Sequence, residues 1–230
     1  MLDRLKHLIR RPAPSIGVVP KDYIRKFLPP NPVVVEAGAH AGHDTVTFAR
    51  QWKGAEIHAF EPVPSLWKAL CQNTAGHGNV YCYPLALAEG PGWSWCDLNL
   101  SEGASNASSS VLPPKEHLQI HPDVHFLKKI RAPSVSLDAW AEQWCVPRID
   151  FLWLDLQGLE LQVLKGGQTA LKNVSALYCE VNLIENYEGA SLYPVLRTWL
   201  EQQGFKVERE ELPWKDSGNV LFIRNAARIQ

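Results

Sequence analysis

Apolar and polar residues follow two patterns along this chain: short continuous apolar runs, and longer segments with helical spacing. The run VVVEAG at 33–38 is apolar and β-branched, which predicts a strand buried on both faces. The next segment, 43–52, has Val46 and Ala49 at helical spacing and is followed by Gly54, which predicts a helix and its end. The same patterns predict further strands at 56–62, 79–89, 149–158 and 175–182, and further helices from Pro64 and at 136–144, 159–171 and 191–204.

Strands and helices therefore alternate, and two more strands, FKVEREEL and NVLFIR, follow the final helix on either side of a turn-rich stretch. Regular alternation of this kind predicts a parallel sheet with helices on both faces. The two final strands are expected to pair antiparallel. The predicted fold class is α/β, a Rossmann-like three-layer sandwich with a mostly parallel seven-stranded sheet and an antiparallel C-terminal strand.

An insertion interrupts the alternation after the third predicted strand. Pro91-Gly92 predicts a turn into an extra hairpin strand at 93–100. The stretch SEGASNASSSVLPP at 101–114 is small and polar, which predicts a mobile loop. Residues 115–135 are ambiguous, with a short helix at 115–120 that Pro122 interrupts. We expect a lid-like insertion near 101–135.

The chain has 230 residues and a formal net charge of -1, enough for one domain and without the basic excess of a nucleic-acid-binding protein. The basic start, MLDRLKHLIRRP, is expected to be solvated, as part of an N-terminal arm over 1–30 that precedes a single domain at 31–230. No apolar run is long enough for an integral membrane segment, and charges interrupt every early apolar run, as a signal peptide would not allow. The five cysteines are odd in number and form no C-x-x-C pair, so we expect a cytoplasmic protein without a disulfide framework.

The turn after the first strand, in EAGAHAGHDT, is the first candidate for chemistry. In a doubly wound sheet, ligands bind beyond the carboxyl ends of the strands. If Gly38 began the dinucleotide fingerprint G-x-G-x-x-G, its second and third glycines would fall on His40 and His43. Two imidazoles at these positions argue against NAD or FAD. Gly38 and Gly42 still allow a tight turn along which a small ligand can lie.

Glu61 ends the second predicted strand, 19 residues after Gly42. A carboxylate at this position can accept hydrogen bonds from both hydroxyls of a ribose. The turn and this acid together predict an adenosine-containing ligand. The alternatives are an ordinary strand-to-helix turn and a solvated strand-end acid.

Five segments, EAGAHAGHDT, AFEPVP, LDLQGLELQVLKGG, LYCEVNLIENYEG and GNVLFIR, together resemble the FkbM-type S-adenosylmethionine-dependent methyltransferases over about residues 30–224. These are class I enzymes that methylate hydroxyl groups of small molecules and glycans. Two positions depart from the family, which often has Asn at His40 and Glu at Gln157.

The resemblance implies that S-adenosyl-L-methionine is the cofactor. Its methionine part would lie along the first turn, its ribose at the end of the second strand, and its adenine against the end of the third. The residues expected at these places are Glu36, Ala37, Gly38, Ala39, His40, Gly42, Glu61, Pro62, Ala86 and Leu87.

Asp155, at the end of the apolar run IDFLWLD, is the candidate general base. A half-buried carboxylate costs several kcal/mol, as an order of magnitude, unless it is paired or used. A base that takes the proton of an alcohol contributes about 10²–10⁴ in rate. Capping of the next helix is the structural alternative. The side chains expected near a hydroxyl acceptor are Gln157, Glu160, Glu180 and Asn182.

Three histidines, His117, His121 and His125, are spaced four apart. Pro122 breaks the helix that would align them, so no metal site is predicted. Thr45 is expected to cap the helix that follows the first turn.

The predicted function is transfer of a methyl group from S-adenosylmethionine to a hydroxyl of a small molecule or glycan. One alternative is a protein of the same fold that binds an adenosyl cofactor without turnover, which Gln157 in place of an acid keeps open. The other is a nicotinamide oxidoreductase, which His40 and His43 oppose.

Overall fold

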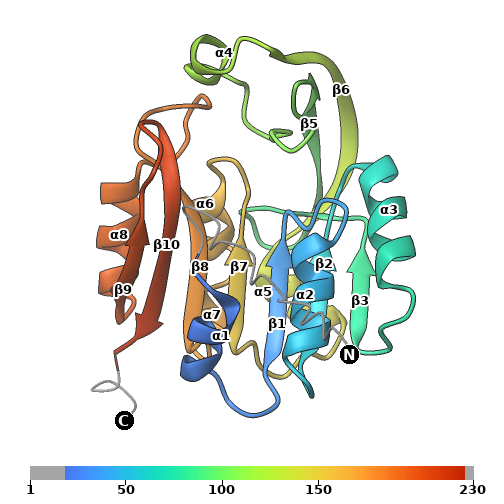
Figure 1. Ribbon diagram of the computed structural model, residues 1–230, viewed down its shortest axis with the longest axis vertical. Coiled ribbons are helices and arrows are strands. Elements are labelled where there is room, and N and C mark those ends of the chain that lie inside the picture. The colour runs from blue at the N-terminus through green and yellow to red at the C-terminus, as the bar shows by residue number, and fades with distance from the viewer. Residues whose placement is uncertain (1–18, 226–230) are drawn as a thin grey trace, which may run out of the picture.

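The computed structural model describes residues 19–225. Within this range seven strands form one sheet in the order β3-β2-β1-β7-β8-β10-β9 (Figure 1). Only β10 runs antiparallel to its neighbours, β8 and β9. The strands are β1 (Val33–Ala37), β2 (Glu56–Phe60), β3 (Val80–Tyr83), β7 (Phe151–Leu154), β8 (Ala176–Asn182), β9 (Phe205–Glu211) and β10 (Ser217–Arg224). This topology confirms the predicted fold class.

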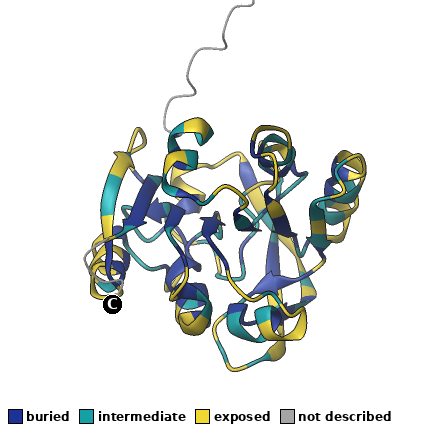
Figure 2. Ribbon diagram, turned by 90° about the horizontal axis from the view of Figure 1, so that it is seen from below, coloured by how far each residue is buried: buried dark blue, intermediate teal, exposed yellow. Residues whose placement is uncertain are grey.

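Helices cover both faces of the sheet, and alternate residues of each central strand pack into two separate cores. In β7, Leu152 and Leu154 belong to one core while Phe151 and Trp153 belong to the other. In Figure 2 the central strands are buried while the surrounding helices have exposed outer surfaces. Burial on both faces explains why these strands read as continuous apolar runs. The first core is covered by α5 (Leu137–Gln143), α6 (Glu160–Lys165), α7 (Gln168–Leu171) and α8 (Tyr193–Gln202), and the second by α1 (Lys21–Ile24) and α2 (His43–Gln51).

The predicted arm at 1–30 is only partly within the described residues, because 1–18 lie outside them. The basic stretch expected to be solvated, MLDRLKHLIRRP, falls wholly within 1–18, and from Val19 onward the chain packs against the second core. Val19, Ile24 and Leu28 are at most 9% exposed and belong to the second core. Lys21 also forms an ion pair with Asp44 of α2. Burial of these apolar side chains keeps the segment on the sheet.

The third predicted strand, 79–89, is divided in the structure. β3 ends at Tyr83, and Pro84 has no backbone N–H to continue the ladder. Ala86–Leu87 then form β4, which pairs with a strand of a second, three-stranded sheet of order β4-β6-β5. α3 (Pro64–Thr74) begins at Pro64 as predicted and covers the β2–β3 side of the main sheet.

The insertion consists mainly of a long antiparallel hairpin, β5 (Trp93–Gly103) and β6 (Val124–Val135), which rises above the main sheet in Figure 1. The ambiguous residues 122–135 are thus mostly strand, and the expected loop 101–114 begins as the end of β5. Between the strands, residues 104–116 fold back over the sheet and the short helix α4 (His117–Ile120) follows. Among residues 19–225, none of the helices combines the length and apolar character needed to cross a bilayer.

Candidate active site

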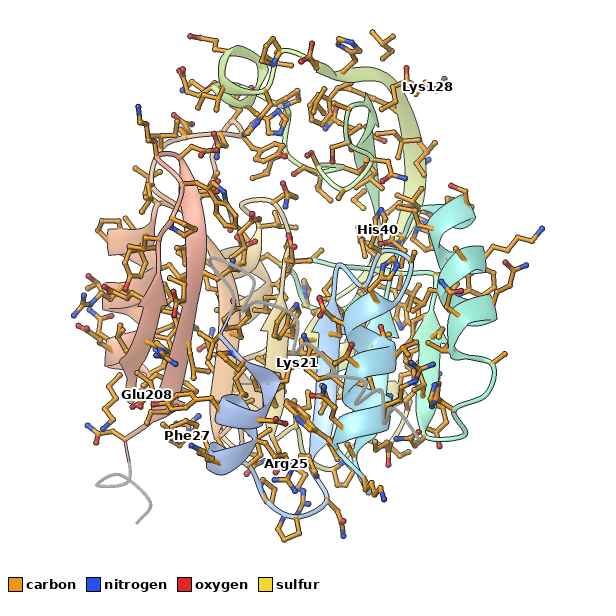
Figure 3. The ribbon with its side chains drawn as sticks, viewed as in Figure 1. Lys21, Arg25, Phe27, His40, Lys128 and Glu208 are labelled. Carbon is orange, nitrogen blue, oxygen red and sulfur yellow. The ribbon has the colours of Figure 1, made fainter. Side chains whose placement is uncertain are left out.

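A cavity of about 90 Å³ lies beyond the carboxyl ends of β1, β2 and β7, and the insertion covers it. The strand order reverses between β1 and β7, which is where ligands bind in doubly wound sheets. His40, on the turn after β1, lies just below the hairpin of the insertion (Figure 3). The cavity is smaller than the roughly 300–1,000 Å³ of typical ligand pockets. A ligand of nucleoside size therefore requires the covering loop to move.

The turn after β1 is built on Gly38, which has a φ of +85°. A Cβ at this position would lie 2.0 Å from the backbone oxygen of Asp155, at the end of the neighbouring β7. Glycine therefore allows β1 and β7 to end side by side. Backbone amides of Gly38 and Ala39 both donate to the carbonyl of Phe60, at the end of β2. The three strand ends are thereby joined around the cavity.

Glu61 follows β2 and is only 5% exposed. Its Oε2 accepts from the backbone N–H of His40 at 2.9 Å, and its Oε1 from that of Val63 at 2.8 Å. Each oxygen retains acceptor capacity, and the residue lines the cavity. Burial raises the pKa of Glu61 to about 7, although the two amide bonds oppose the rise.

Glu36 lies within β1, two residues before Gly38, and is 2% exposed. Its Oε2 accepts a hydrogen bond from the Thr45 hydroxyl at 2.6 Å. The expectation that Thr45 caps α2 was therefore wrong, because its hydroxyl is used on Glu36 and Gly42 takes the N-cap position without a side-chain bond. Burial raises the pKa of Glu36 to about 8.

Asp155 follows β7 and presents its side chain to the cavity. Gln157 Nε2 donates at 2.7 Å to Asp155 Oδ1 and at 2.7 Å to Oε2 of Glu180 in β8. Gln157 Oε1 accepts from the Tyr187 hydroxyl at 2.7 Å, so both ends of the amide are occupied. The surrounding protein raises the pKa of Asp155 by desolvation, even though its side chain is open to the cavity.

The site is acidic and has no paired cation. Among residues 19–225, no lysine, arginine or histidine forms an ion pair with an acid of the group Glu36, Glu61, Asp155, Glu160 and Glu180. Such a site favours a positively charged ligand and disfavours a polyanion such as a dinucleotide.

The loop at 104–112 covers the cavity through contacts with the turns after β1 and β7 and with the loop after β8. His40 Nε2 lies 2.9 Å from Asn106 Oδ1. The Ser110 hydroxyl donates to the carbonyl of Gln157 at 3.2 Å, and the Tyr187 hydroxyl also reaches the carbonyl of Ser108 at 3.0 Å. These polar contacts join the insertion to the β1 and β7 turns.

The Methyltransferase FkbM domain model matches residues 36–207 of this chain, which contain the whole site. The chain belongs to the FkbM methyltransferase family. This assignment confirms the resemblance seen in the sequence and contradicts the nicotinamide oxidoreductase alternative.

Two curated relatives of this FkbM methyltransferase carry methyltransferase names. The 2-O-methyltransferase NoeI of Sinorhizobium fredii is 28% identical over 186 residues, covering 79% of this chain and 75% of the relative. Methyltransferase sdnD of Sordaria araneosa is 27% identical over 212 residues, covering 81% and 78%. Among solved structures, a chain of the fibrillarin/Nop5p complex superposes with a TM-score of 0.50 at 15% identity, covering 86% of this chain and 75% of that one. That likeness concerns the fold alone.

The FkbM methyltransferase cavity brings together most of the residues singled out in the sequence. Those that line it are Ala37, Gly38, His40, Glu61, Pro62, Ala86, Leu87, Asp155 and Gln157. The other three, Glu36, Ala39 and Gly42, are buried and do not line the cavity.

Two of the four residues expected near an acceptor, Glu160 and Asn182, do not line the cavity and form hydrogen bonds outside it. Glu160 is 1% exposed, and its Oε1 accepts from the amides of Leu156 and Gly158, so it holds the turn before α6. Asn182 is 2% exposed and accepts from Asn186 at 3.2 Å, away from the cavity. Gln157 lines the cavity, and Glu180 reaches it through Gln157.

Sequence reasoning predicted a lid-like insertion near 101–135 but missed the apolar side of the cavity and the individual lid residues that line it. The missed residues include Phe60, Leu66, Leu85, Leu98, Leu159, Asn106, Ala107, Ser109, Ser110 and Val111. The apolar ones resemble ordinary core residues in the sequence. The small polar composition of 101–110 was the one available signal for the lid.

The three spaced histidines do not converge on a metal site. His117 and His121 face each other across 4.8 Å between ring centroids, whereas His125 is an exposed residue of β6. Over the described part of the chain, no group of three potential ligands is arranged to hold a metal ion.

Proposed function

We propose that this FkbM methyltransferase transfers a methyl group from S-adenosyl-L-methionine to a hydroxyl group of a small molecule or glycan. The observation that carries the proposal is the buried carboxylate of Glu61, which closes β2 and lines the cavity across from the Gly38 turn. An adenosyl group has two neighbouring ribose hydroxyls that such a carboxylate accepts.

The residues present fit this cofactor. The Gly38 turn lines the cavity beside β1, and the apolar residues Ala86 and Leu87 offer a surface for a flat ring. The acids of the site suit a ligand that carries both a sulfonium and an ammonium group. When bound, S-adenosylmethionine supplies a methyl group on a positively charged sulfur, which leaves as a neutral thioether.

Asp155 is the proposed general base. Its carboxylate faces the cavity, and Gln157 holds one of its oxygens, leaving the other to take the proton of an acceptor hydroxyl. The raised pKa of Asp155 makes this carboxylate a stronger base than an exposed aspartate. Closure of the 104–112 loop excludes water from the same space.

The test of cofactor binding is calorimetry with S-adenosylhomocysteine on the wild type and on Glu61→Gln. The amide keeps the shape of the side chain but replaces one acceptor oxygen and the charge. We expect the affinity to fall by about 10- to 100-fold, the value of a hydrogen bond to a charged group.

Glu56→Gln is the matched control, because Glu56 begins the same strand at its exposed end, and it should bind like the wild type. Equal affinity in Glu61→Gln would contradict the ribose assignment. Failure of the wild type to bind would contradict the cofactor itself.

Turnover is tested separately by following release of labelled methyl groups to hydroxyl-bearing acceptors, including free sugars and oligosaccharides. Transfer that disappears in Asp155→Asn supports the proposed enzyme. Tight binding of S-adenosylhomocysteine without transfer to any acceptor would instead favour a cofactor-binding protein without turnover.

A further inference from the structure

Asp155 and Glu180 are two carboxyl groups held by one amide nitrogen. Gln157 Nε2 lies 2.7 Å from an oxygen of each. The orientation of the amide is determined by its partners, since Oε1 accepts from the Tyr187 hydroxyl and Nε2 therefore faces the acids. Gln157 itself has a left-handed φ of +54°, which is uncommon outside glycine, so the network holds a strained turn in place.

We propose that Asp155 and Glu180 together hold a single proton, that this proton is on Glu180 and is hydrogen-bonded to Asp155, and that Asp155 is therefore the only negatively charged acid of the pair. The protonation state of the pair is independent of the proposed function, and only the role of Asp155 as the general base rests on it. Glu180 is then a positioning residue, because it acts on the acceptor only through Asp155.

Three features of the surroundings place the proton on Glu180. Glu180 lies near Glu160 and Asp216, which are both acidic, whereas Asp155 opens to the cavity and faces His40. Two carboxyl groups bonded to the same amide nitrogen cannot both be ionised without a compensating cation, because their negative charges would repel each other. No described lysine or arginine pairs with either acid.

The directions of the pKa shifts of the two acids agree with this arrangement. Desolvation, followed by the charge of Asp155, holds the pKa of Glu180 well above its usual range. The hydrogen bond from Glu180 lowers the pKa of Asp155, opposing the rise that burial causes. The other groups that act on the pair are Glu36, Asp44, Glu61 and Tyr187, and His40 joins Gln157 and Glu180 in favouring the ionised form of Asp155.

The deciding variant is Glu180→Gln. A glutamine reproduces the protonated acid, because its amide N–H can donate to Asp155 while its oxygen accepts from Gln157. We expect methyl transfer to fall by at most about tenfold, the value of one ordinary hydrogen bond. Asp155→Asn should lose about 10²- to 10⁴-fold, as expected for a missing base.

A readout that needs no turnover is the infrared carbonyl band of protonated carboxyl groups. At about pH 9 the acids whose pKa is raised only to about 7 or 8, Glu36, Glu61 and Glu160, are ionised, so the remaining band reports on the pair. The wild type should keep this band, and Glu180→Gln should lose it. Glu201→Gln, on the exposed face of α8, is the control and should leave it unchanged.

A wild-type spectrum without the band at that pH would overturn the shared proton. An inactive Glu180→Gln beside an active Asp155→Asn would overturn the assignment of roles. Because the band is measured without cofactor or acceptor, failure of the proposed methyl transfer leaves this test intact.

Discussion

Gly38 is the residue on which the junction of β1, β2 and β7 depends. Its left-handed φ of +85° disfavours every other residue type, and a Cβ would meet the carbonyl oxygen of Asp155 at 2.0 Å. One substitution would therefore disturb both the turn and the strand end that carries the proposed base.

We expect Gly38→Ala to reduce the free energy of unfolding by about 1–3 kcal/mol for the backbone alone, with a further cost for displacing Asp155. Urea unfolding measures the change. Gly78→Ala is the matched control, since a Cβ there meets nothing within 4 Å. Similar stability of the two variants would show that the turn relaxes more easily than the structure indicates.

At the scale of elements, the loop at 104–112 is held on the main sheet by a few polar contacts together with the packing of Val111 and Leu112 against the first core. The Tyr187 hydroxyl is central, because it contacts both Gln157 and the backbone of Ser108. A cover fastened by a few hydrogen bonds can open without unfolding the hairpin beneath it.

Tyr187→Phe should loosen this loop. The single hydroxyl proton of Tyr187, which lies within reach of both Gln157 Oε1 and the Ser108 carbonyl, is lost, so we expect amide hydrogen exchange over 104–112 to become about tenfold faster. Tyr193→Phe is the control, because it removes another buried tyrosine's hydroxyl, which bonds to Glu210 of the edge strand β9. Unchanged exchange in Tyr187→Phe would mean that other contacts keep the loop closed.

The same elements show what sequence could predict. The central strands of the main sheet were predictable because burial on both faces leaves uninterrupted apolar runs. β6 was missed because its sequence, VHFLKKIRAPSV, is charged and contains proline, and it becomes a strand by pairing with β5 and β4.

The site divides in the same way. Gly38 and Glu61 were predictable because their roles follow from local position at the ends of strands. The bridge from Gln157 to Glu180 spans 23 residues, and the bond from Ser110 to Gln157 spans 47, so neither leaves a local pattern. For the same reason Glu160 was expected near the acceptor, when its carboxylate holds the turn beside it.

For the whole molecule, the buried acids make stability depend on pH. Glu36 has a pKa of about 8 in the fold, against an ordinary value of 4.5. The folded state therefore holds its proton over a range in which the unfolded state has lost it. The contribution of this proton to stability falls as pH rises from about 4.5 to about 8.

Glu36→Gln should remove this dependence, because the amide has no charge and its oxygen still accepts from Thr45. At pH 5 the variant should match the wild type closely, and at pH 9 it should be more stable, on the order of a few kcal/mol. Thermal unfolding from pH 5 to 9 without ligand measures this. The exposed Glu89→Gln serves as control, and parallel profiles for all three proteins would contradict the buried-charge account.

The order of the sheet also bears on how the protein is made. β10 lies between β8 and β9 but follows both in the chain, so a ribosome delivers β9 before the only strand that joins it to the sheet. An unpaired strand in that interval invites aggregation. The sequence of β9, FKVEREE, is mostly charged, and charged residues on an unpaired strand disfavour aggregation before β10 is synthesised.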